Sequence, residues 1–190
     1  MKVAPTELPE VLLVQPRVLR DERGWFLESW VEDRYRAAGI AGPFVQDNLS
    51  RSRRGVVRGL HYQWPHPQGK LVSVPHGAVW DVAVDVRPGS PTFGRWTARV
   101  LSARNGRQLW IPPGFAHGFA VLSRSAAVHY RCTDAYHPEC ETTVLWSDPD
   151  LGIAWPVADP LLSARDAAAP RLRDLPADAL PGASFSAVPG

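Results

Sequence analysis

Hydrophobic residues fall in short runs of β-strand character between about residues 10 and 155. Prolines (19) and glycines (15) separate these runs, and no helical period persists between them. Turn sequences such as RPGSPTFG and ARNG follow several of the runs. The expected strands are residues 11–19, 55–63, 70–86, 96–102, 107–113, 119–123, 126–133 and 142–147. About eight strands of this kind predict an all-β domain, either a sandwich or a closed jelly roll.

Two short segments carry helical signals. VEDRYRAAG, residues 31–39, predicts one short helix closed by Gly39, and SARDAAAP, residues 163–170, predicts another turn or two. From Pro176 onward the chain is rich in small and turn-forming residues, so we expect a mobile tail over residues 176–190. No internal repeat or second domain is evident, and residues 1–175 therefore predict a single domain.

Strand alternation places several polar side chains. Tyr130 falls in step with Val128 and Cys132, so its phenol is expected to point inward. Asp81 and Asp85 share a face in AVWDVAVDV, either the solvated face or an inward one. An inward carboxylate raises the free energy of the fold unless it is paired, which makes Asp81 a candidate for a special role.

Composition and charge narrow the function classes. The chain has 190 residues, 45% hydrophobic and 21% charged, with a formal net charge of +2. This charge points neither to nucleic acid nor to membrane, and the short RSRR run at 51–54, without interleaved aromatics, fits a solvated turn better than a nucleic-acid patch. The N-terminal apolar run is too short for a signal peptide, so we expect a cytoplasmic protein. Cys132 and Cys140 provide neither a disulfide framework nor a CxxC metal pair.

One basic residue is conspicuous by its type. Of 21 basic residues only Lys2 and Lys70 are lysine. A compact ammonium can donate to a single oxygen, which the planar guanidinium group does poorly. Lys70 is therefore a candidate for a specific role, although a surface lysine is the simpler interpretation.

IPPGFAHGF, residues 111–119, has the PxGxxH spacing of the second cupin motif, with His117 as its histidine. Metal-binding cupins also need an HxH pair and a glutamate on an earlier strand, because a divalent ion requires three or four convergent ligands. The corresponding stretch RGLHYQ has only His61, with Gln63 in place of the second histidine. The sequence therefore predicts that no metal is bound there.

The chain resembles the dTDP-4-dehydrorhamnose 3,5-epimerase family from about residue 3 to residue 175. The matching segments are DERGWFLESW (21–30), QDNLSRSRRGVVRGLHYQ (46–63), QGKLV (68–72), VWDVAVDVRPGSPTFGRW (79–96), RQLWIPPGFAHGF (107–119), YRCTDAYHPECE (130–141), DPDLGIAWP (148–156) and LLSARDAAAP (161–170). The resemblance implies a cupin-like jelly-roll β-barrel with a few short helices. It also implies a homodimer that epimerises dTDP-4-keto-6-deoxy-D-glucose at C3 and C5 to dTDP-4-keto-L-rhamnose, without a metal or organic cofactor.

The resemblance also suggests catalytic roles. His61 resembles the family's base, Asp166 its carboxylate partner, and Tyr130 the acid that reprotonates from the opposite face. Lys70 resembles the group that stabilises the enolate oxygen. These roles suit the chemistry, because a C4 ketone acidifies the protons at C3 and C5, and inversion needs a base on one face and an acid on the other.

Further residues are implied as contacts to the thymidine, the diphosphate or the sugar. They are Arg23, Glu28, Gln46, Asn48, Arg58 and, in a less defined role, His117. The chain departs from the family pattern after Asp134, where Ala135 replaces one of two common aromatics and leaves only Tyr136. His76 and Ala78 stand where an arginine and a glutamate are common, a change expected to alter contacts near the barrel mouth.

Three alternatives stay open at this point. The first is an epimerase that inverts only C3 or only C5, since both centres flank one ketone. The second is a metal-dependent cupin enzyme, which Gln63 disfavours. The third is a binding module for sugar nucleotides with no catalytic activity.

Overall fold

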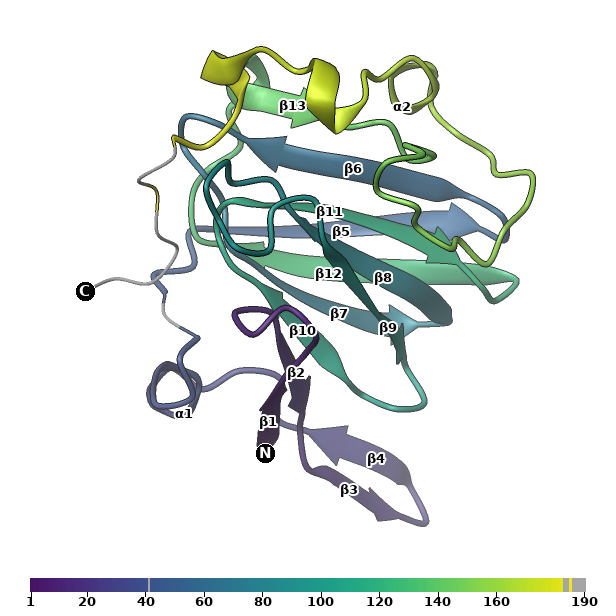
Figure 1. Cartoon of the computed structure of the whole chain (residues 1–190). Helices are drawn as coiled ribbons and strands as arrows, with labels where there is room; N and C mark the ends of the chain where they lie inside the picture. The colour runs from purple at the N-terminus through teal and green to yellow at the C-terminus, as the bar shows by residue number, and fades with distance from the viewer. Residues whose placement is uncertain (41, 183–184, 186–190) are drawn as a thin grey trace.

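The computed structural model describes residues 1–40, 42–182 and 185. In this structure two antiparallel sheets face each other (Figure 1). The six-stranded sheet has the order β1 (Lys2–Pro5), β2 (Leu12–Gln15), β10 (Gln108–Ile111), β7 (Lys70–His76), β12 (Ser125–Cys132), β5 (Gln46–Arg53). The five-stranded sheet has the order β13 (Glu141–Thr143), β6 (Val57–Gln63), β11 (Phe115–Val121), β8 (Ala78–Asp85), β9 (Trp96–Ser102). The predicted all-β, cupin-like jelly roll with few short helices is confirmed.

The main hydrophobic core lies between the two sheets. Val72 and Val128 from the six-stranded sheet pack there with Val79, Phe115 and Phe119 from the five-stranded sheet. A second buried cluster covers the other face of the five-stranded sheet, where residues after β13 pack against β6, β8 and β11. Strands buried on both faces read as continuous apolar runs, and all seven residues of β11 are indeed buried.

The strand predictions hold for most of the chain, but several bounds change. The run at 119–123 is the end of β11, the run at 142–147 is strand only as far as Thr143, and β1 was not predicted. The expected strand at 11–19 divides into β2 and β3 (Val18–Asp21) on either side of Pro16. The 70–86 run divides into β7 and β8 at Gly77, whose φ of +77° suits a glycine in a tight turn. Strand β5 was not predicted, because QDNLSRSR is polar at every position except Leu49. The RSR part of the RSRR run therefore lies on a strand and not in a turn.

The helices are short, as expected. They are α1 (Glu32–Arg36), α2 (Ala164–Ala167) and the 3-10 helices η1 (Pro138–Cys140), η2 (Leu172–Asp174) and η3 (Ala177–Ala179). Part of the predicted tail contacts the barrel. The carbonyl oxygen of Ala179 accepts a hydrogen bond from Tyr62 of β6 at 2.9 Å, and Leu180 packs on the second cluster. Residues 183–184 and 186–190 lie outside the described residues, and the mobility of the tail stays a prediction.

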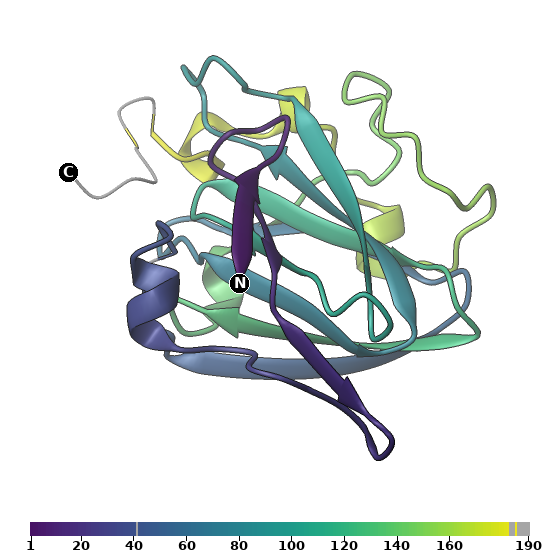
Figure 2. The same cartoon turned by 90° about the horizontal axis from the view of Figure 1, so that it is seen from below.

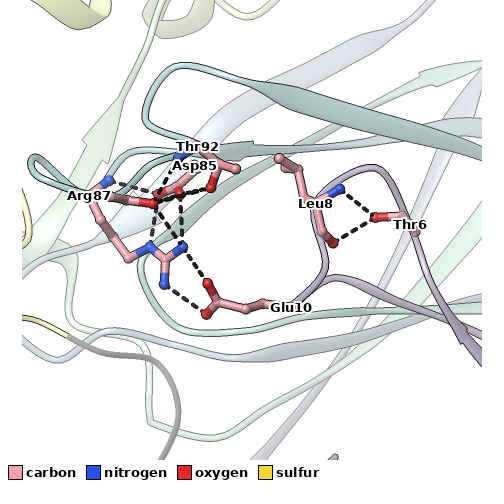
Figure 3. A network of polar contacts seen from close by, with 7 residues as sticks. Thr6, Leu8, Glu10, Asp85, Arg87 and Thr92 are labelled. Carbon is pink, nitrogen blue, oxygen red and sulfur yellow. Dashed lines mark hydrogen bonds and ion pairs between the residues drawn. The ribbon is translucent and has the colours of Figure 1, made fainter.

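A polar network ties the N-terminal segment to the turn after β8 (Figure 3). The guanidinium of Arg87 donates to Asp85 and to Glu10, with donor–acceptor distances of 2.7–2.8 Å. Thr92 also donates to Asp85, at 2.6 Å. Burial alone raises the pKa of Asp85, but these donors outweigh burial and hold it below its usual value. Asp85 is therefore an inward, fully paired carboxylate.

Strands β3 and β4 (Gly24–Leu27) form a separate hairpin that projects away from both sheets (Figures 1 and 2). Trp25 and Phe26 of this hairpin are 52% and 67% exposed. Large apolar side chains gathered on an exposed element are typical of a protein contact surface. None of the described helices has the length and apolar character needed to cross a membrane.

Candidate active site

A cavity of about 360 Å³ opens between the two sheets. It is lined by Gln46, Asn48, Ser50, Arg58, His61, Gln68, Lys70, His117, Gly118, Phe119, Tyr130, Tyr136 and Glu141. Strands β5, β7 and β12 supply one wall, and β6 and β11 supply the opposite wall. The predicted residues His61, Lys70, Tyr130, Gln46, Asn48, Arg58 and His117 all meet here.

His61 on β6 forms a close pair with Asp166 of α2. Its Nε2 lies 2.6 Å from Oδ1 of Asp166, whose side chain is 4% exposed. The hydroxyl of Ser163 caps α2 by accepting the backbone N–H of Asp166 at 3.1 Å, which fixes the position of the carboxylate. Burial raises the pKa of Asp166, but hydrogen bonds led by that from His61 lower it below its usual value. Asp166 is thus a fixed anion that orients the imidazole through Nε2 and leaves Nδ1 available.

His117 on β11 lies directly opposite His61 in the β6–β11 register and has its own carboxylate. Its Nε2 is 3.0 Å from Oδ2 of Asp81, and both side chains are buried. The alternative that Asp81 sits on a solvated face is therefore wrong. The other oxygen of Asp81 has no hydrogen-bond partner among the described residues. His117 is held by this pair at the back of the cavity.

Two glycines allow β6 and β11 to approach closely beside these histidines. A Cβ on Gly59 would lie 2.6 Å from Cα of Gly118, and a Cβ on Gly118 would lie 2.8 Å from the carbonyl oxygen of Arg58. Gly59 also has a φ of +115°, which side chains rarely adopt. The glycines of RGLH and AHGF therefore set the spacing between the two histidine-bearing strands.

Tyr130 and Lys70 come from the facing sheet. Tyr130 packs against the main core, and its ring lies 6.4 Å from that of His117, centroid to centroid. The inward orientation predicted from alternation is confirmed. Burial raises the pKa of Tyr130, so its hydroxyl keeps its proton at neutral pH. Among the described residues no hydrogen-bond partner meets that hydroxyl.

Lys70 is 9% exposed, which excludes the surface-lysine interpretation. Its Nζ has one contact at hydrogen-bond distance within the described part of the chain, the carbonyl oxygen of His61 at 3.5 Å. Burial lowers the pKa of this ammonium. A buried cation with so few protein partners is well placed to bind a developing oxyanion.

Three further predicted residues line the cavity on or beside its rim. The amide of Gln46 donates to Oδ1 of Asn48 at 3.0 Å and accepts the backbone N–H of Tyr136 at 2.8 Å. Nε of Arg58 donates to the hydroxyl of Ser52 at 3.0 Å, which leaves the terminal nitrogens of the guanidinium available. Such a group suits an anionic diphosphate.

Arg23 and Glu28 do not reach this cavity. Arg23 lies in the projecting hairpin, 85% exposed, and pairs with Asp21 at 2.6 Å. Glu28, just after β4, pairs with Arg34 at 2.8 Å. Their predicted contact with substrate therefore has no support from the fold of a single chain. His76 and Ala78 are also remote, since neither lines the cavity and His76 bonds to Ser125 at 3.1 Å.

The cavity lining also includes residues that were not predicted from the sequence: Gln68, Glu141, Ser50, Gly118 and Phe119. Tyr136, which the sequence marked only as the aromatic remaining after Ala135, lines the cavity as well. Tyr136 donates to Oε2 of Glu141 at 2.9 Å, and Arg165 also pairs with that carboxylate. Burial of Gln68 to 8% exposure was not predictable from its proline-rich loop. The position of Tyr136, directly after Ala135 in a segment where the family commonly has two aromatics, was the signal in the sequence for its role.

The site defines a class of protein: a jelly-roll barrel with a histidine–carboxylate pair on one wall of its cavity and a protonated tyrosine on the other. Comparisons with known proteins narrow this class. The profile described as dTDP-4-dehydrorhamnose 3,5-epimerase matches residues 5–174. The chain belongs to the dTDP-4-dehydrorhamnose 3,5-epimerase family.

Individual relatives agree with this assignment. The dTDP-4-dehydrorhamnose 3,5-epimerase of Pseudomonas aeruginosa is 54% identical over 168 residues, which cover 87% of this chain and 93% of the relative. That of Neisseria gonorrhoeae is 52% identical over 169 residues, or 88% of this chain, and the chain spans about half (52%) of its length. A crystal structure of dTDP-6-deoxy-D-glucose-3,5-epimerase from Legionella pneumophila in complex with dTDP-4-keto-L-rhamnose matches with a TM-score of 0.93 and 52% identity, covering 95% of this chain and 97% of that chain.

Proposed function

We propose that this protein epimerises dTDP-4-keto-6-deoxy-D-glucose at C3 and C5 to dTDP-4-keto-L-rhamnose. The observation that carries the proposal is the placement of His61 with Asp166 on one wall and Tyr130 on the other, across a single cavity. Inversion of a carbon centre requires removal of a proton from one face and its return on the opposite face. Two facing walls with a base and an acid supply this geometry.

The reaction proceeds by two proton transfers at each centre. Nδ1 of neutral His61 takes the proton next to the ketone, and the electron pair moves to the C4 oxygen as an enolate. The Lys70 ammonium stabilises that oxygen. Tyr130 then donates its proton to the same carbon from the opposite face, and exchange with solvent returns both side chains to their starting states. The oxidation state does not change, so the step needs no redox cofactor.

Asp166 supports the base without touching the reacting carbon. Its lowered pKa keeps it anionic, so it stabilises the imidazolium that forms when His61 accepts a proton. His117, held by Asp81, faces the same cavity and is available to bond the sugar. Gln46, Asn48 and Arg58 are assigned to the nucleotide and diphosphate.

We also propose that the protein is a homodimer, which would account for the remaining predicted residues. The projecting β3–β4 hairpin exposes Trp25 and Phe26, and Arg23 of the same hairpin does not line its own cavity. We infer that Arg23 and Glu28 contact substrate only in the cavity of a second copy of the chain. We also assign the protein to the cytoplasm, since its two cysteines are free thiols.

Incubation with dTDP-4-keto-6-deoxyglucose in heavy water tests the proposal. Deuterium read by NMR at both C3 and C5 supports double epimerisation. Label at one centre favours the mono-epimerase instead, and label at neither favours a binding module. Metal analysis of the same preparation addresses the cupin alternative, because stoichiometric iron, nickel or manganese bound through His61 and His117 would overturn the proposal.

A further inference from the structure

Two loops at the rim of the cavity are pinned together by buried glutamines. The amide of Gln63, 3% exposed, donates to the carbonyl oxygen of His66 at 2.9 Å and accepts the backbone N–H of His137 at 2.9 Å. The amide of Gln68 donates to the carbonyl oxygen of Asp134 at 2.9 Å. The backbones that carry His66, Asp134 and His137 are therefore fixed relative to one another.

The side chains of these three residues converge. One ligand atom from each lies within 4.8 Å of the other two. Nδ1 of His66 is 3.4 Å from Oδ2 of Asp134, and Nε2 of His137 is 3.9 Å from Oδ1 of the same carboxylate. Two ligands of a tetrahedral Zn²⁺ with bonds of about 2.0–2.1 Å lie about 3.3 Å apart. Rotation of the two imidazoles out of their present arrangement brings this trio to that geometry.

The outer partner of His137 also fits a metal ligand. Nδ1 of His137 lies 3.4 Å from Oε1 of Glu139, which leaves Nε2 directed toward Asp134. A carboxylate on the far nitrogen orients a zinc-binding histidine and increases its basicity. The trio thus has the donor set and the outer partner that zinc sites share.

The two histidine rings are stacked in this structure, with centroids 4.3 Å apart and planes at 21°. An ion bound by both imidazoles lies in the plane of each ring, so the stack opens when the ion binds. The side chains of His66 and His137 are 53% and 32% exposed, which leaves room for that rotation. His66 also has a φ of +66°, a sparsely populated backbone region for a non-glycine residue, where strain is often held at ligand clamps.

We propose that His66, Asp134 and His137 form a Zn²⁺ site, with water as the fourth ligand. None of the three lines the substrate cavity, so this ion takes no part in the proton transfers. The site instead clamps the 64–69 loop to the 133–140 segment. Tyr136 lies between two of the ligands and lines the cavity, so zinc stabilises one wall of the substrate site.

The test uses the full chain without a histidine tag, freed of metals with a chelator, and calorimetric titration with Zn²⁺ at neutral pH. We expect one equivalent to bind. His66→Gln and His137→Gln each weaken binding by at least about tenfold, and Glu139→Gln, at an exposed outer position, weakens it by up to about tenfold. His129→Gln is the matched control, because His129 is another partly exposed histidine beside a carboxylate, 3.6 Å from Asp47.

Hydrogen exchange with and without Zn²⁺ locates the ion. Protection confined to the 64–69 and 133–140 segments supports the site. Zinc protection elsewhere, equal affinity in all variants, or no saturable binding of one equivalent would each overturn it. Thermal unfolding of the metal-free variants, compared with metal-free wild type, separates loss of a ligand from loss of the fold.

Discussion

The two walls of the cavity hold their candidate catalytic groups in different ways. On the five-stranded sheet, His61 and His117 each bond a buried carboxylate, at 2.6 Å and 3.0 Å. On the six-stranded sheet, Lys70 reaches only a carbonyl oxygen at 3.5 Å, and the Tyr130 hydroxyl meets no partner among the described residues. The two histidines are therefore paired before substrate arrives, whereas Lys70 and Tyr130 keep hydrogen-bonding capacity that a ligand can use.

This difference has opposite consequences for the stability of the fold and for catalysis. A paired group stabilises the fold and its own orientation, whereas a buried group without partners raises the free energy of the folded state. Lys70 and Tyr130 occupy inward positions at which apolar side chains would stabilise the fold more. Their unmet hydrogen-bonding capacity is what a ketone oxygen and a carbanion can use.

The largest effect is expected on the paired wall. His61→Ala removes the base, and kcat should fall by about 10²–10⁴-fold. Turnover of dTDP-4-keto-6-deoxyglucose followed by NMR checks this. His76→Gln, outside the cavity, is the control and should retain full activity. Wild-type turnover in His61→Ala would show that the base lies elsewhere.

Lys70→Met tests the unpaired wall, where stability and activity should move in opposite directions. Loss of the ammonium should lower kcat by about 10²–10³-fold, because the enolate oxygen loses its stabilising charge. Replacement of a buried cation by an apolar side chain of similar size should raise the free energy of unfolding by about 1–2 kcal/mol. Denaturant unfolding and steady-state kinetics measure the two effects.

Lys2→Met is the matched control for this experiment, since Lys2 is the other lysine of the chain and is exposed on β1. It should change neither the free energy of unfolding nor kcat.

A pH series tests the direction in which the stability difference between wild type and Lys70→Met changes. Because the pKa of Lys70 is lowered in the folded state, the unfolded chain binds more protons just below the ordinary value of 10.5. Wild type should therefore gain stability relative to Lys70→Met as pH rises through that window. A loss of stability in Lys70→Met at neutral pH would contradict the account.

A smaller effect is expected for Asp166→Asn, which keeps the shape of the pair but removes its charge. We expect kcat to fall by about 10–100-fold, because the imidazolium loses its counter-ion. The folded-state pKa of Asp166 lies below its ordinary value of 3.8, so the charge of this carboxylate stabilises the fold above that pH. This contribution is lost as pH falls through the lowered pKa. A stability difference between wild type and variant that grows on acidification would contradict the pairing.

The smallest effect is expected at the rim. Arg58→Gln should raise KM for the nucleotide sugar by about tenfold and leave kcat nearly unchanged, because a diphosphate contact persists from ground state to transition state. Steady-state kinetics measure both constants. Arg53→Gln, a neighbouring exposed arginine outside the cavity lining, is the control. A fall in kcat with constant KM would place Arg58 in the chemical step.

Sequence pattern predicted the parts of this molecule that obey simple periodicity. Inward Tyr130 followed from alternation, and an all-β sandwich or jelly roll followed from short apolar runs between turn residues, with the resemblance to the family deciding for the jelly roll. Strand β5 could not be found this way, because its polar residues lie at a sheet edge, where pairing with β12 and not burial defines the strand. The pairing of His61 with Asp166 joins residues 105 positions apart, so only resemblance connected them before the fold was known. Gln68 lines the cavity from a loop and Glu141 from the start of β13, and no local pattern encodes either placement.

The most direct test of the two-wall account separates proton removal from inversion. Tyr130→Phe keeps the base and removes the acid, so in heavy water this variant should still exchange the proton next to the ketone. His61 should return a deuteron to the face from which the proton left, and recovered substrate should carry deuterium with its configuration retained, while inversion falls by about 10²–10⁴-fold. Wild-type inversion in Tyr130→Phe, or loss of exchange together with inversion, would contradict the assignment of base and acid to opposite walls.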